Sequence, residues 1–483
     1  MSGLAGYIGE RATAKDVEQM IEAIKHRGSG SPSLQAVPSG FAGFVGANSL
    51  GFSGDKAPFV IMDGTLIRDD RQNGASDADY LREEYMKHGK DAFSRMVGSF
   101  SCAIMDENEC IIARDHVGAR PLVYHELPQG DFLFASEAKA LKQRADSVEE
   151  LPPGHYYSTQ KGLGQFKNCS VTLPEWESTE EAIKAVRELL IKSIEQAISS
   201  GNIKGVALSG GLDSSIILAV AREFDKDIAA FTATFAERHG EDLEYAKLLA
   251  DQLGVDHHIY EITREDIKNV LPEAVWYLES FDEDCITGFI ANYYTSRFAS
   301  DHVNSVLVGE GADELFGGYF RELQDISDPE EKERIGRKLL EVSYNTALRR
   351  LDRGWMANSI EYFAPFLHPA VVSLANNIPM DLKVYQKEDA SIEKWILREA
   401  FRDFLPQEIA DRPKLRFSRG VGVDDQVDQA IPASIGEKEL QQSPKSSGGI
   451  ALQSPKELYF YKLFQEHFPQ GYEGLTARWD PFK

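Results

Sequence analysis

Residues 204–220, KGVALSGGLDSSIILAV, constrain the fold of this 483-residue chain more than any other stretch. The first part is a short apolar run that reads as a buried strand, and the last part has apolar residues at helical spacing. A turn of small residues, 209–211, lies between them. Backbone N–H groups approach an anion closely only where no Cβ intervenes, and a helix start favours negative charge. The stretch therefore predicts a phosphate-binding loop.

This loop is not a Walker A loop, because the Gly-Lys-Ser/Thr ending is absent. It carries Asp213 instead, a carboxylate suited to a Mg²⁺ ion that sits on the phosphates. The alternative is an ordinary helix start capped by Ser209 or Asp213. SGGLDSS resembles the pyrophosphate loop of the ATP-pyrophosphatase superfamily, whose members cleave ATP between the α- and β-phosphates. Together with a second motif described below, the resemblance implies nucleotide contacts from Leu208, Ser209, Gly210, Gly211, Asp213, Ser214, Ser215 and Gly309.

Length and charge restrict the other possibilities. A chain of this length predicts two or three domains. The net charge of −25 argues against a nucleic-acid partner, and no apolar run approaches a membrane span. The N-terminus lacks a signal sequence, so we expect a cytoplasmic protein. The sequence does not predict an oligomeric state, and the spacing of its cysteines predicts reduced thiols that bind no metal, at positions Cys102, Cys110, Cys169 and Cys285.

Residues 1–165 read as short strands separated by turns, with a helical stripe near the start. Three segments, RDHVGARPL at 114–122, FASEAKAL at 134–141 and LPPGHY at 151–156, resemble the glutamine-hydrolysing domain of asparagine synthetase. That domain is an N-terminal-nucleophile hydrolase. The resemblance implies an αββα sandwich of two sheets between helices.

The catalytic parts of that domain are missing. The family attacks glutamine with a cysteine that becomes the first residue, and Ser2 stands in its place here. A hydroxyl is a much poorer nucleophile than a thiol. The family motifs HRGPD and NGE read HRGSG at 26–30 and DGT at 63–65, and we also expect a turn at Asp63 and Gly64. We predict that this domain, with its degenerate Ser2 position, does not hydrolyse glutamine.

Strands and helices alternate in the second domain, which we place at residues 175–483. Helices are expected at 179–200 and 242–253, and strands at 206–208, 229–235 and 303–308. This alternation predicts a doubly wound parallel sheet, in which the ligand lies beyond the carboxyl ends of the strands. The chain as a whole is therefore expected to be an α/β protein of two domains.

A second motif, VGEGADELFGGY at 308–319, follows one of these strands. It could be a solvated acidic turn, but it resembles the asparagine synthetase sequence GEGSDEVFGGY. The resemblance implies that Asp213 and Asp313 hold Mg²⁺ and that Glu310 lies near the reacting carboxylate. There Glu310 could act as a base toward an amine.

A third motif, RPKLRFSRGVG at 412–422, resembles the family sequence RQKEQFSDGVG, and Lys414 falls on the family lysine. A lysine there would stabilise the negative charge of the adenylate and of pyrophosphate. A solvated basic loop is the alternative, and a closing lid is a further expectation.

Two positions are expected to line the substrate pocket. Glu361 lies in a segment similar to the family's LEVRVPFLD. Residues 279–287, ESFDEDCIT, align with ETYDVTTIR, so that Asp284 adds an anion and the family arginine is lost. This pocket would repel aspartate and favour a substrate that carries an ammonium group.

These features predict an ATP-dependent amide ligase of the asparagine synthetase and β-lactam synthetase family, with ATP and Mg²⁺ as cofactors. It would adenylate a small-molecule amino-carboxylate, release pyrophosphate and let an amine displace AMP. The favoured hypothesis is closure of a lactam within the substrate, as in antibiotic biosynthesis, although β-lactam synthetases have a tyrosine in place of Glu310. The alternatives are an asparagine synthetase that uses free ammonia and a non-catalytic ATP-binding protein.

Overall fold

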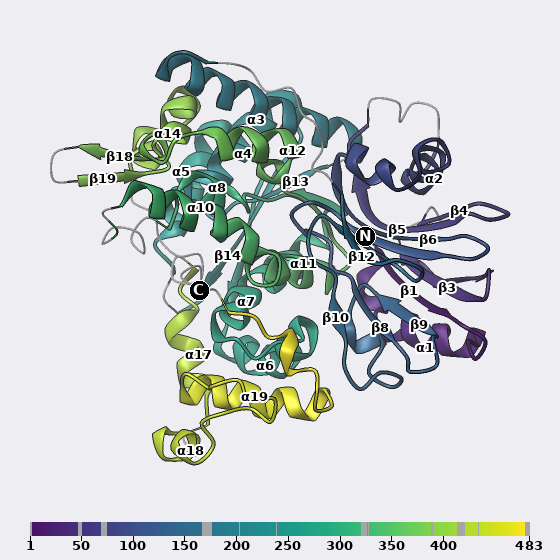
Figure 1. The fold of residues 1–483 in the computed structure, drawn as a ribbon. Helices are drawn as coiled ribbons and strands as arrows, with labels where there is room; N and C mark the ends of the chain where they lie inside the picture. Colours follow the sequence, from purple (N-terminus) through teal and green to yellow (C-terminus); the bar gives the residue numbers. More distant parts are fainter. Residues whose placement is uncertain are drawn as a thin grey trace.

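The structure is a computed structural model that describes residues 2–46, 51–68, 75–166, 176–201, 203–237, 239–319, 326, 328–387, 390–412, 421–432 and 434–478. Two domains lie side by side (Figure 1). The first is built from two antiparallel sheets and the second around one parallel sheet. The last strand of the first domain ends at Gln165, and the first helix of the second begins at Thr179.

Each antiparallel sheet of the first domain has six strands. The first sheet has the order β10 (Glu149–Glu150), β8 (Val123–Glu126), β9 (Phe132–Ala135), β1 (Ser2–Ile8), β3 (Gly40–Gly46) and β2 (Ser33–Val37). The second has the order β12 (Gly162–Gln165), β11 (His155–Ser158), β7 (Cys110–Arg114), β6 (Gly98–Met105), β5 (Phe59–Leu66) and β4 (Phe52–Ser53). The 3₁₀ helices within the described residues of this domain are η1 (Lys25–Arg27), η4 (Gly89–Arg95) and η5 (Ala138–Ala140).

The two sheets pack face to face. Helix α1 (Ala14–Ala23) covers the first sheet and helix α2 (Asp77–His88) covers the second. Alternate residues of both sheets point inward to one buried cluster, which includes Leu4, Phe44 and Ile112. This αββα sandwich confirms the fold expected for the first domain.

The turn expected at Asp63 and Gly64 is instead part of a strand. β5 runs on to Leu66, with Asp63 opposite Ser101 and Gly64 opposite Phe100 of β6. Gly64 has φ of +112°, and a Cβ there would lie 2.1 Å from the Ser99 carbonyl oxygen. The glycine therefore serves a close approach between strands and does not reverse the chain.

The sheet of the second domain has five strands in the order β15 (His257–Ile262), β14 (Ala229–Phe235), β13 (Gly205–Ala207), β16 (Ser305–Leu307) and β17 (Glu361–Phe363). Every neighbouring pair is parallel. The chain winds outward from β13 through β14 and β15, and then returns to add β16 and β17 on the other side. This confirms the doubly wound sheet and puts its switch point between β13 and β16.

Helices cover both faces of this sheet. One buried cluster joins α3 (Thr179–Gly201), α4 (Leu212–Phe224), α5 (Asp242–Leu253), α12 (Pro369–Asn377) and α14 (Trp395–Phe401). The other face packs against α6 (Arg264–Leu278), α7 (Glu283–Ala299) and α11 (Ala347–Met356). The remaining elements that the structure describes are α8 (Ala312–Phe316), α10 (Pro329–Ser343), η6 (Pro365–Leu367), α13 (Met380–Lys383), β18 (Val384–Lys387), β19 (Ala390–Glu393), η7 (Arg402–Phe404), α15 (Gln407–Ala410), α17 (Asp424–Ala430), α18 (Glu437–Gln442), α19 (Pro455–His467) and η8 (Glu473–Leu475).

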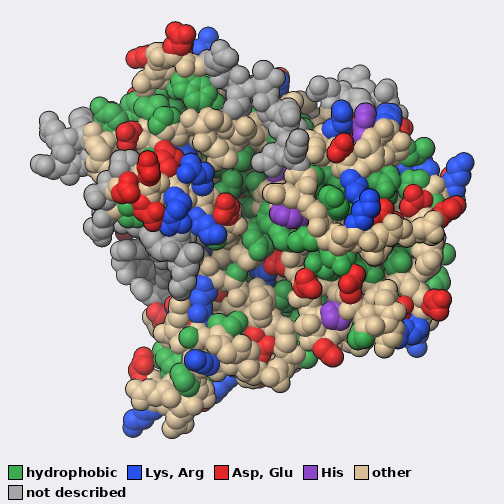
Figure 2. Space-filling model, in the orientation of Figure 1, with side chains coloured by type: hydrophobic (Ala, Val, Ile, Leu, Met, Phe, Trp, Pro, Cys, Tyr) green, Lys and Arg blue, Asp and Glu red, His purple; other side chains and the backbone are tan. Residues whose placement is uncertain are grey.

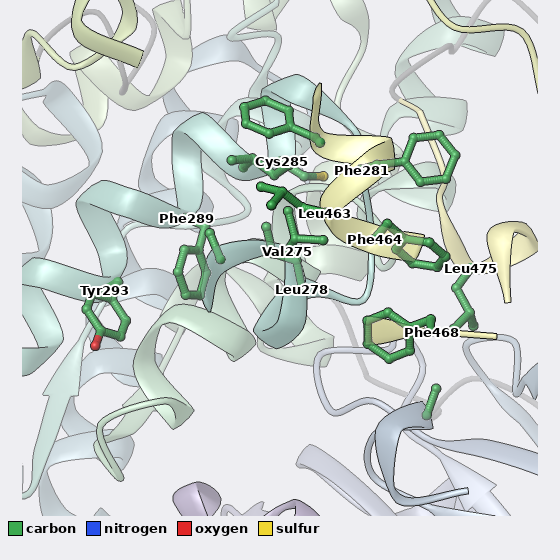
Figure 3. Packing of buried hydrophobic residues seen from close by; sticks show 14 of the residues in the cluster. Val275, Leu278, Phe281, Cys285, Phe289, Tyr293, Leu463, Phe464, Phe468 and Leu475 are labelled. Carbon is green, nitrogen blue, oxygen red and sulfur yellow. The ribbon is translucent and has the colours of Figure 1, made fainter. Parts of the chain in front are cut away.

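Helix α19 closes a large apolar cluster. Figure 3 shows Phe464 and Phe468 facing side chains of α6 and α7. The ring of Phe464 lies 5.4 Å from that of Phe281 and 4.8 Å from that of Phe468. The same cluster contains Val17 of α1, so this core is shared by the two domains.

Within the described residues, every helix is too short or too polar to span a lipid bilayer. On the face drawn in Figure 2, Lys and Arg side chains lie interspersed with Asp and Glu. Cys102, Cys110 and Cys285 are buried free thiols, and burial raises the pKa of each of them. Cys169 lies outside the described residues.

Candidate active site

The predicted phosphate loop connects β13 to α4. Two serines fold it back on itself, because Ser214 Oγ accepts a hydrogen bond from the Ser209 N–H at 3.1 Å and lies 2.9 Å from Ser209 Oγ. The Gly211 N–H donates to Ser209 Oγ at 3.2 Å. Leu208 and Ser215 are buried on either side of the turn. The start of α4 faces this compact turn, which is the arrangement that binds phosphate in other proteins.

Gly210 holds this loop against its neighbours. Its φ is +79°, and a Cβ there would lie 2.2 Å from the Asp242 carbonyl oxygen. Its own carbonyl accepts from Arg412 Nη1 at 2.8 Å, while Arg412 Nη2 contacts the Asp242 carboxylate at 2.6 Å. Lys414 lies outside the described residues. The basic motif thus contacts the phosphate loop through its first residue, two positions before Lys414.

The second motif forms a turn beside the first. β13 and β16 are neighbours in the sheet, with Val206 opposite Leu307, so both loops leave the same edge. A Cβ on Gly309 would lie 3.0 Å from both the Asp213 Cβ and the Ser214 nitrogen. The two predicted loops are therefore in contact, with Gly309 at the point of contact.

Lys394 joins the carboxylates of the two loops. It follows the hairpin of β18 and β19, is 1 % exposed, and has its Nζ 2.7 and 2.6 Å from the two oxygens of Asp213. The same nitrogen lies 2.5 Å from Asp313 Oδ1. A Cβ on Gly318 would lie 2.6 Å from Lys394 Cε, so the glycine leaves room for this side chain.

This arrangement tests whether Asp213 and Asp313 fit Mg²⁺. A single buried ammonium bridges both carboxylates, so their oxygens are close enough to share one cation. Carboxylate oxygens are the protein ligands that Mg²⁺ prefers, usually one or two with phosphate oxygens completing the set. The two residues fit the metal, provided that Lys394 moves aside.

Glu310 lies next to an arginine that the sequence did not single out. Arg350 of α11 has its Nη2 3.5 Å from Glu310 Oε1. A Cβ on Gly288 of α7 would lie 2.7 Å from Arg350 Cδ, so the glycine makes the space for this arginine. Burial lowers the pKa of Arg350, but Glu310, together with Tyr319, Cys285 and Glu314, raises it overall. The site therefore has a permanent cation beside the predicted base.

A third carboxylate lies behind this pair. Glu314 is buried and accepts a hydrogen bond from the Tyr319 hydroxyl at 2.9 Å. Burial, followed by the charges of Asp313 and Glu310, raises the pKa of Glu314 to about 7. The acidic turn thus contains a carboxyl group that is partly protonated near neutral pH.

The two residues expected in the substrate pocket lie in different places. Asp284 is exposed in the first turn of α7, four residues before Gly288, and so lies on the helix face that packs against Arg350. Glu361 pairs with Ser305 at the amino end of β16, about 10 Å or more from the loop that follows the carboxyl end. Its carboxylate binds Arg120 of the first domain. This position in the domain interface does not fit the pocket role expected for Glu361.

Ser2 is buried in the first domain beside a carboxylate. Its Oγ donates to Asp63 Oδ1 at 2.8 Å, and its carbonyl accepts from Arg27 Nε at 2.9 Å. Asp63 Oδ2 in turn accepts from Ser136 Oγ at 3.0 Å and from Arg27 Nη2 at 3.1 Å. An amide hydrolase needs hydrogen-bond donors where the oxyanion forms. Here a carboxylate lies next to the residue in the nucleophile position.

Sequence reasoning missed Lys394 and Arg350. Each contacts a residue elsewhere in the chain, 181 residues away for Lys394 and 40 residues away for Arg350, and neither was assigned a role from the sequence. The only local signals are the glycines that give them space, Gly318 and Gly288.

Known proteins resemble both domains. The asparagine synthase family matches residues 185–341 and 327–478, and the glutamine amidotransferase domain matches residues 60–167. Asparagine synthetase [glutamine-hydrolyzing] 2 of Arabidopsis thaliana is 30% identical over 430 residues, which are 84% of this chain and 73% of the relative. The root asparagine synthetase [glutamine-hydrolyzing] of Pisum sativum is 30% identical over 433 residues, with the same coverage. The solved NMN synthetase of Francisella tularensis has a TM-score of only 0.29 at 13% identity, over 64% of this chain and all of that one.

Proposed function

This chain belongs to the asparagine synthetase family of ATP-dependent carbon–nitrogen ligases, and we propose that it forms the amide of an aspartate-like substrate with free ammonia. ATP would adenylate the substrate carboxylate with release of pyrophosphate. Ammonia would then attack the acyl carbon, and AMP would leave with the electron pair of the C–O bond. Lactam closure, which the sequence alone favoured, becomes the second candidate.

The residues around Ser2 support free ammonia as the nitrogen donor. Asp63 places a negative charge beside the Ser2 hydroxyl, 2.8 Å away, and Arg27 and Ser136 hold that carboxylate in place. A tetrahedral oxyanion of glutamine hydrolysis would form next to this carboxylate and be destabilised. This observation carries the proposal that glutamine is not the nitrogen donor.

The nucleotide would bind across the two loops. The phosphate loop and the start of α4 would contact the phosphates, and Asp213 and Asp313 would hold Mg²⁺. The metal, when bound, supplies positive charge that offsets the phosphate oxygens. Lys394 would move from the two carboxylates onto the phosphates, because the metal then replaces it as their counter-ion. We assign Lys414 the family role of stabilising the negative charge of the adenylate and of pyrophosphate.

Arg350 supports aspartate as the substrate type. The sequence suggested that the pocket had lost its cation with the family arginine, yet Arg350 supplies one 3.5 Å from Glu310. A guanidinium is suited to bind a substrate carboxylate through two hydrogen bonds. Glu310 would accept the proton that ammonia loses as the amide forms.

One observation favours the second candidate. Asp284 is an exposed anion on the same helix face as Gly288 and would attract an ammonium group of a substrate. A substrate that carries both an amine and a carboxylate could then close a ring without ammonia.

Product analysis distinguishes these functions. The purified protein would be supplied with MgATP, aspartate and either ammonium chloride or glutamine, and pyrophosphate, AMP, asparagine and glutamate would be measured. We expect asparagine with ammonium and no glutamate from glutamine. Glutamate release would refute the proposed amine source. Pyrophosphate release that needs no ammonium, with a substrate carrying its own amine, would favour lactam closure.

A pair of variants tests the site. Glu310→Gln should lower the rate of amide formation strongly, because the base is lost while the size of the side chain is kept. The control Glu244→Gln removes an exposed carboxylate of α5 and should keep the full rate. Equal activity of both variants would remove Glu310 from the site.

A further inference from the structure

We propose that the first domain acts as a clamp that positions helix α11 for the ligase reaction, and that Arg27 is its positioning residue. This role goes beyond the proposed function, because it assigns a task to a domain that does not hydrolyse glutamine. It rests on that function only for the kinetic part of its test.

Helix α11 lies between the first domain and α7 (Figure 1). Its residue Asp352 lies on the side of the helix opposite Arg350, and Asp352 and the next residue, Arg353, both bind side chains of the first domain. Arg350 and Gly354, four residues apart, form another face toward α7, where a Cβ on Gly354 would lie 2.6 Å from the Asn292 Cβ. One helix thus contacts the first domain on one side and carries Arg350 on the other.

Arg27 makes the central contact of this interface. Its side chain is fully buried, and its Nη1 and Nη2 bind the two oxygens of Asp352 at 2.7 and 3.1 Å. The same guanidinium binds Asp63 at 3.1 Å and Glu137 at 2.8 Å, and the Ser2 carbonyl at 2.9 Å. The Ser2 carbonyl and helix α11 therefore both bind the side chain of Arg27.

Further ion pairs join the domains around Arg27. Arg353 of α11 binds Glu137 of the first domain at 3.2 Å, and Arg120 of the first domain binds Asp352 at 3.5 Å. Ion pairs of this kind link four cations and five carboxylates. The side chain of Glu361 is 10 % exposed, and each of the other eight side chains is at most 3 % exposed. The nine residues are Arg27, Arg120, Lys139, Arg353, Asp63, Glu137, Glu279, Asp352 and Glu361.

The geometry of such buried pairs is strongly restrained, because each charge needs its partner in the absence of water. Burial lowers the pKa of Arg27, but Asp352, Asp63 and Glu137 raise it well above its usual value, so the guanidinium stays charged. Loss of Arg27 would remove both hydrogen bonds from its guanidinium to Asp352 and would make α11 more mobile. Arg350 would then lose its fixed position beside Glu310.

The test compares Arg27→Gln and Arg27→Lys with the control Arg11→Gln. Arg11 also pairs with an aspartate of the first domain, Asp131 at 2.8 Å, but its side chain is 48% exposed. Hydrogen–deuterium exchange is measured on the unliganded full chain for residues 347–356 and 308–316. In Arg27→Gln we expect about tenfold faster exchange in both segments and unchanged exchange in α3, with an intermediate effect in Arg27→Lys.

Exchange in 347–356 that stays at the wild-type rate in Arg27→Gln, or that rises equally in Arg11→Gln, would overturn the proposal. If Arg27→Gln fails to fold, the exchange rates of Arg27→Lys test the proposal instead, because lysine keeps the charge but cannot make both contacts to Asp352. This part of the test needs no substrate, so it stands even if the proposed reaction is wrong.

Kinetics separate positioning from a general loss of folded protein. We expect the KM for the carboxylate substrate to rise about tenfold in Arg27→Gln, with the KM for ATP unchanged and partial recovery in Arg27→Lys. A smaller folded fraction would lower kcat and leave both KM values unchanged, and that result would refute a positioning role.

Discussion

Replacement of Lys394 by methionine should make the stability of the protein depend on magnesium. In the wild type, the Lys394 ammonium is the buried counter-ion of Asp213 and Asp313, with N–O distances of 2.6 and 2.5 Å. Methionine has similar volume but no charge. In the Lys394→Met variant the two carboxylates face each other without a cation.

The size of the effect follows from the burial of this ion group. Removal of one partner from a fully buried ion pair costs about 3–5 kcal/mol, and we expect the lower end of this range because the two remaining carboxylates are 15 and 17% exposed. Mg²⁺ can take the place of the ammonium in the variant, and at about 100 times its Kd it would restore about 2.7 kcal/mol. In the wild type the metal must first displace Lys394, so Mg²⁺ alone should stabilise it much less.

Urea unfolding is followed by tryptophan fluorescence with and without magnesium chloride, and always without ATP. It measures the loss of stability in the variant and its recovery by Mg²⁺. Lys204→Met is a matched control, because Lys204 also binds an aspartate at 2.7 Å but is 50% exposed. It should change little in stability and should not respond to magnesium. An equal response of wild type and Lys394→Met to Mg²⁺ would refute the competition between lysine and metal.

Three further changes have distinct expected outcomes. Lys414→Met should abolish pyrophosphate release and leave ATP binding measurable by calorimetry, and a normal rate would remove Lys414 from the site. Ser2→Ala should leave ammonia-dependent activity unchanged, because Ser2 is not expected to act as a nucleophile, and a loss would reopen the question of glutamine hydrolysis. Burial, with Asp284 and Glu457, raises the pKa of Asp282 from 3.8 to about 6, so the folded state binds this proton more tightly than the unfolded state does. The wild type should therefore lose stability as the pH rises from about 4 to about 6. Asp282→Asn, which keeps the helix cap, should be more stable than the wild type by up to about 3 kcal/mol at pH 7.5 and not at pH 4, as measured by urea unfolding. A gain in stability that is independent of pH would contradict this reasoning.

The parts of the fold that the sequence predicted depend on neighbours in the chain. The phosphate loop needs only a strand, glycines and a helix start within residues 204–220, and each has its own local pattern. The alternation of strands and helices is equally local, and the parallel sheet follows from it. The prediction of a turn at Asp63 and Gly64 was wrong because glycine has two structural uses. It can reverse a chain, or it can allow two strands to approach closely, as it does here.

The parts that the sequence missed depend on distant partners. Lys394 is 181 residues from Asp213 in the chain, and Arg27 is 325 residues from Asp352. A charged side chain has no periodicity that reveals its partner. Glu361 was misplaced for a related reason: similarity of a segment shows that its strand exists, but not which end of the strand faces the ligand.

The apolar cluster closed by α19 has a consequence for the synthesis of this protein. Side chains of α1, near residue 20, and of α19, near residue 464, belong to the same buried core. On the ribosome, α1 can pack on β1 and β3 of its own sheet early, but the part of this core that α19 covers stays open until almost the whole chain has emerged. Contacts between such distant segments close slowly, and exposed apolar surface favours aggregation in the meantime. The nascent chain thus exposes the apolar side chains of α6 and α7 until α19 arrives, and its yield should depend on chaperones that cover this surface.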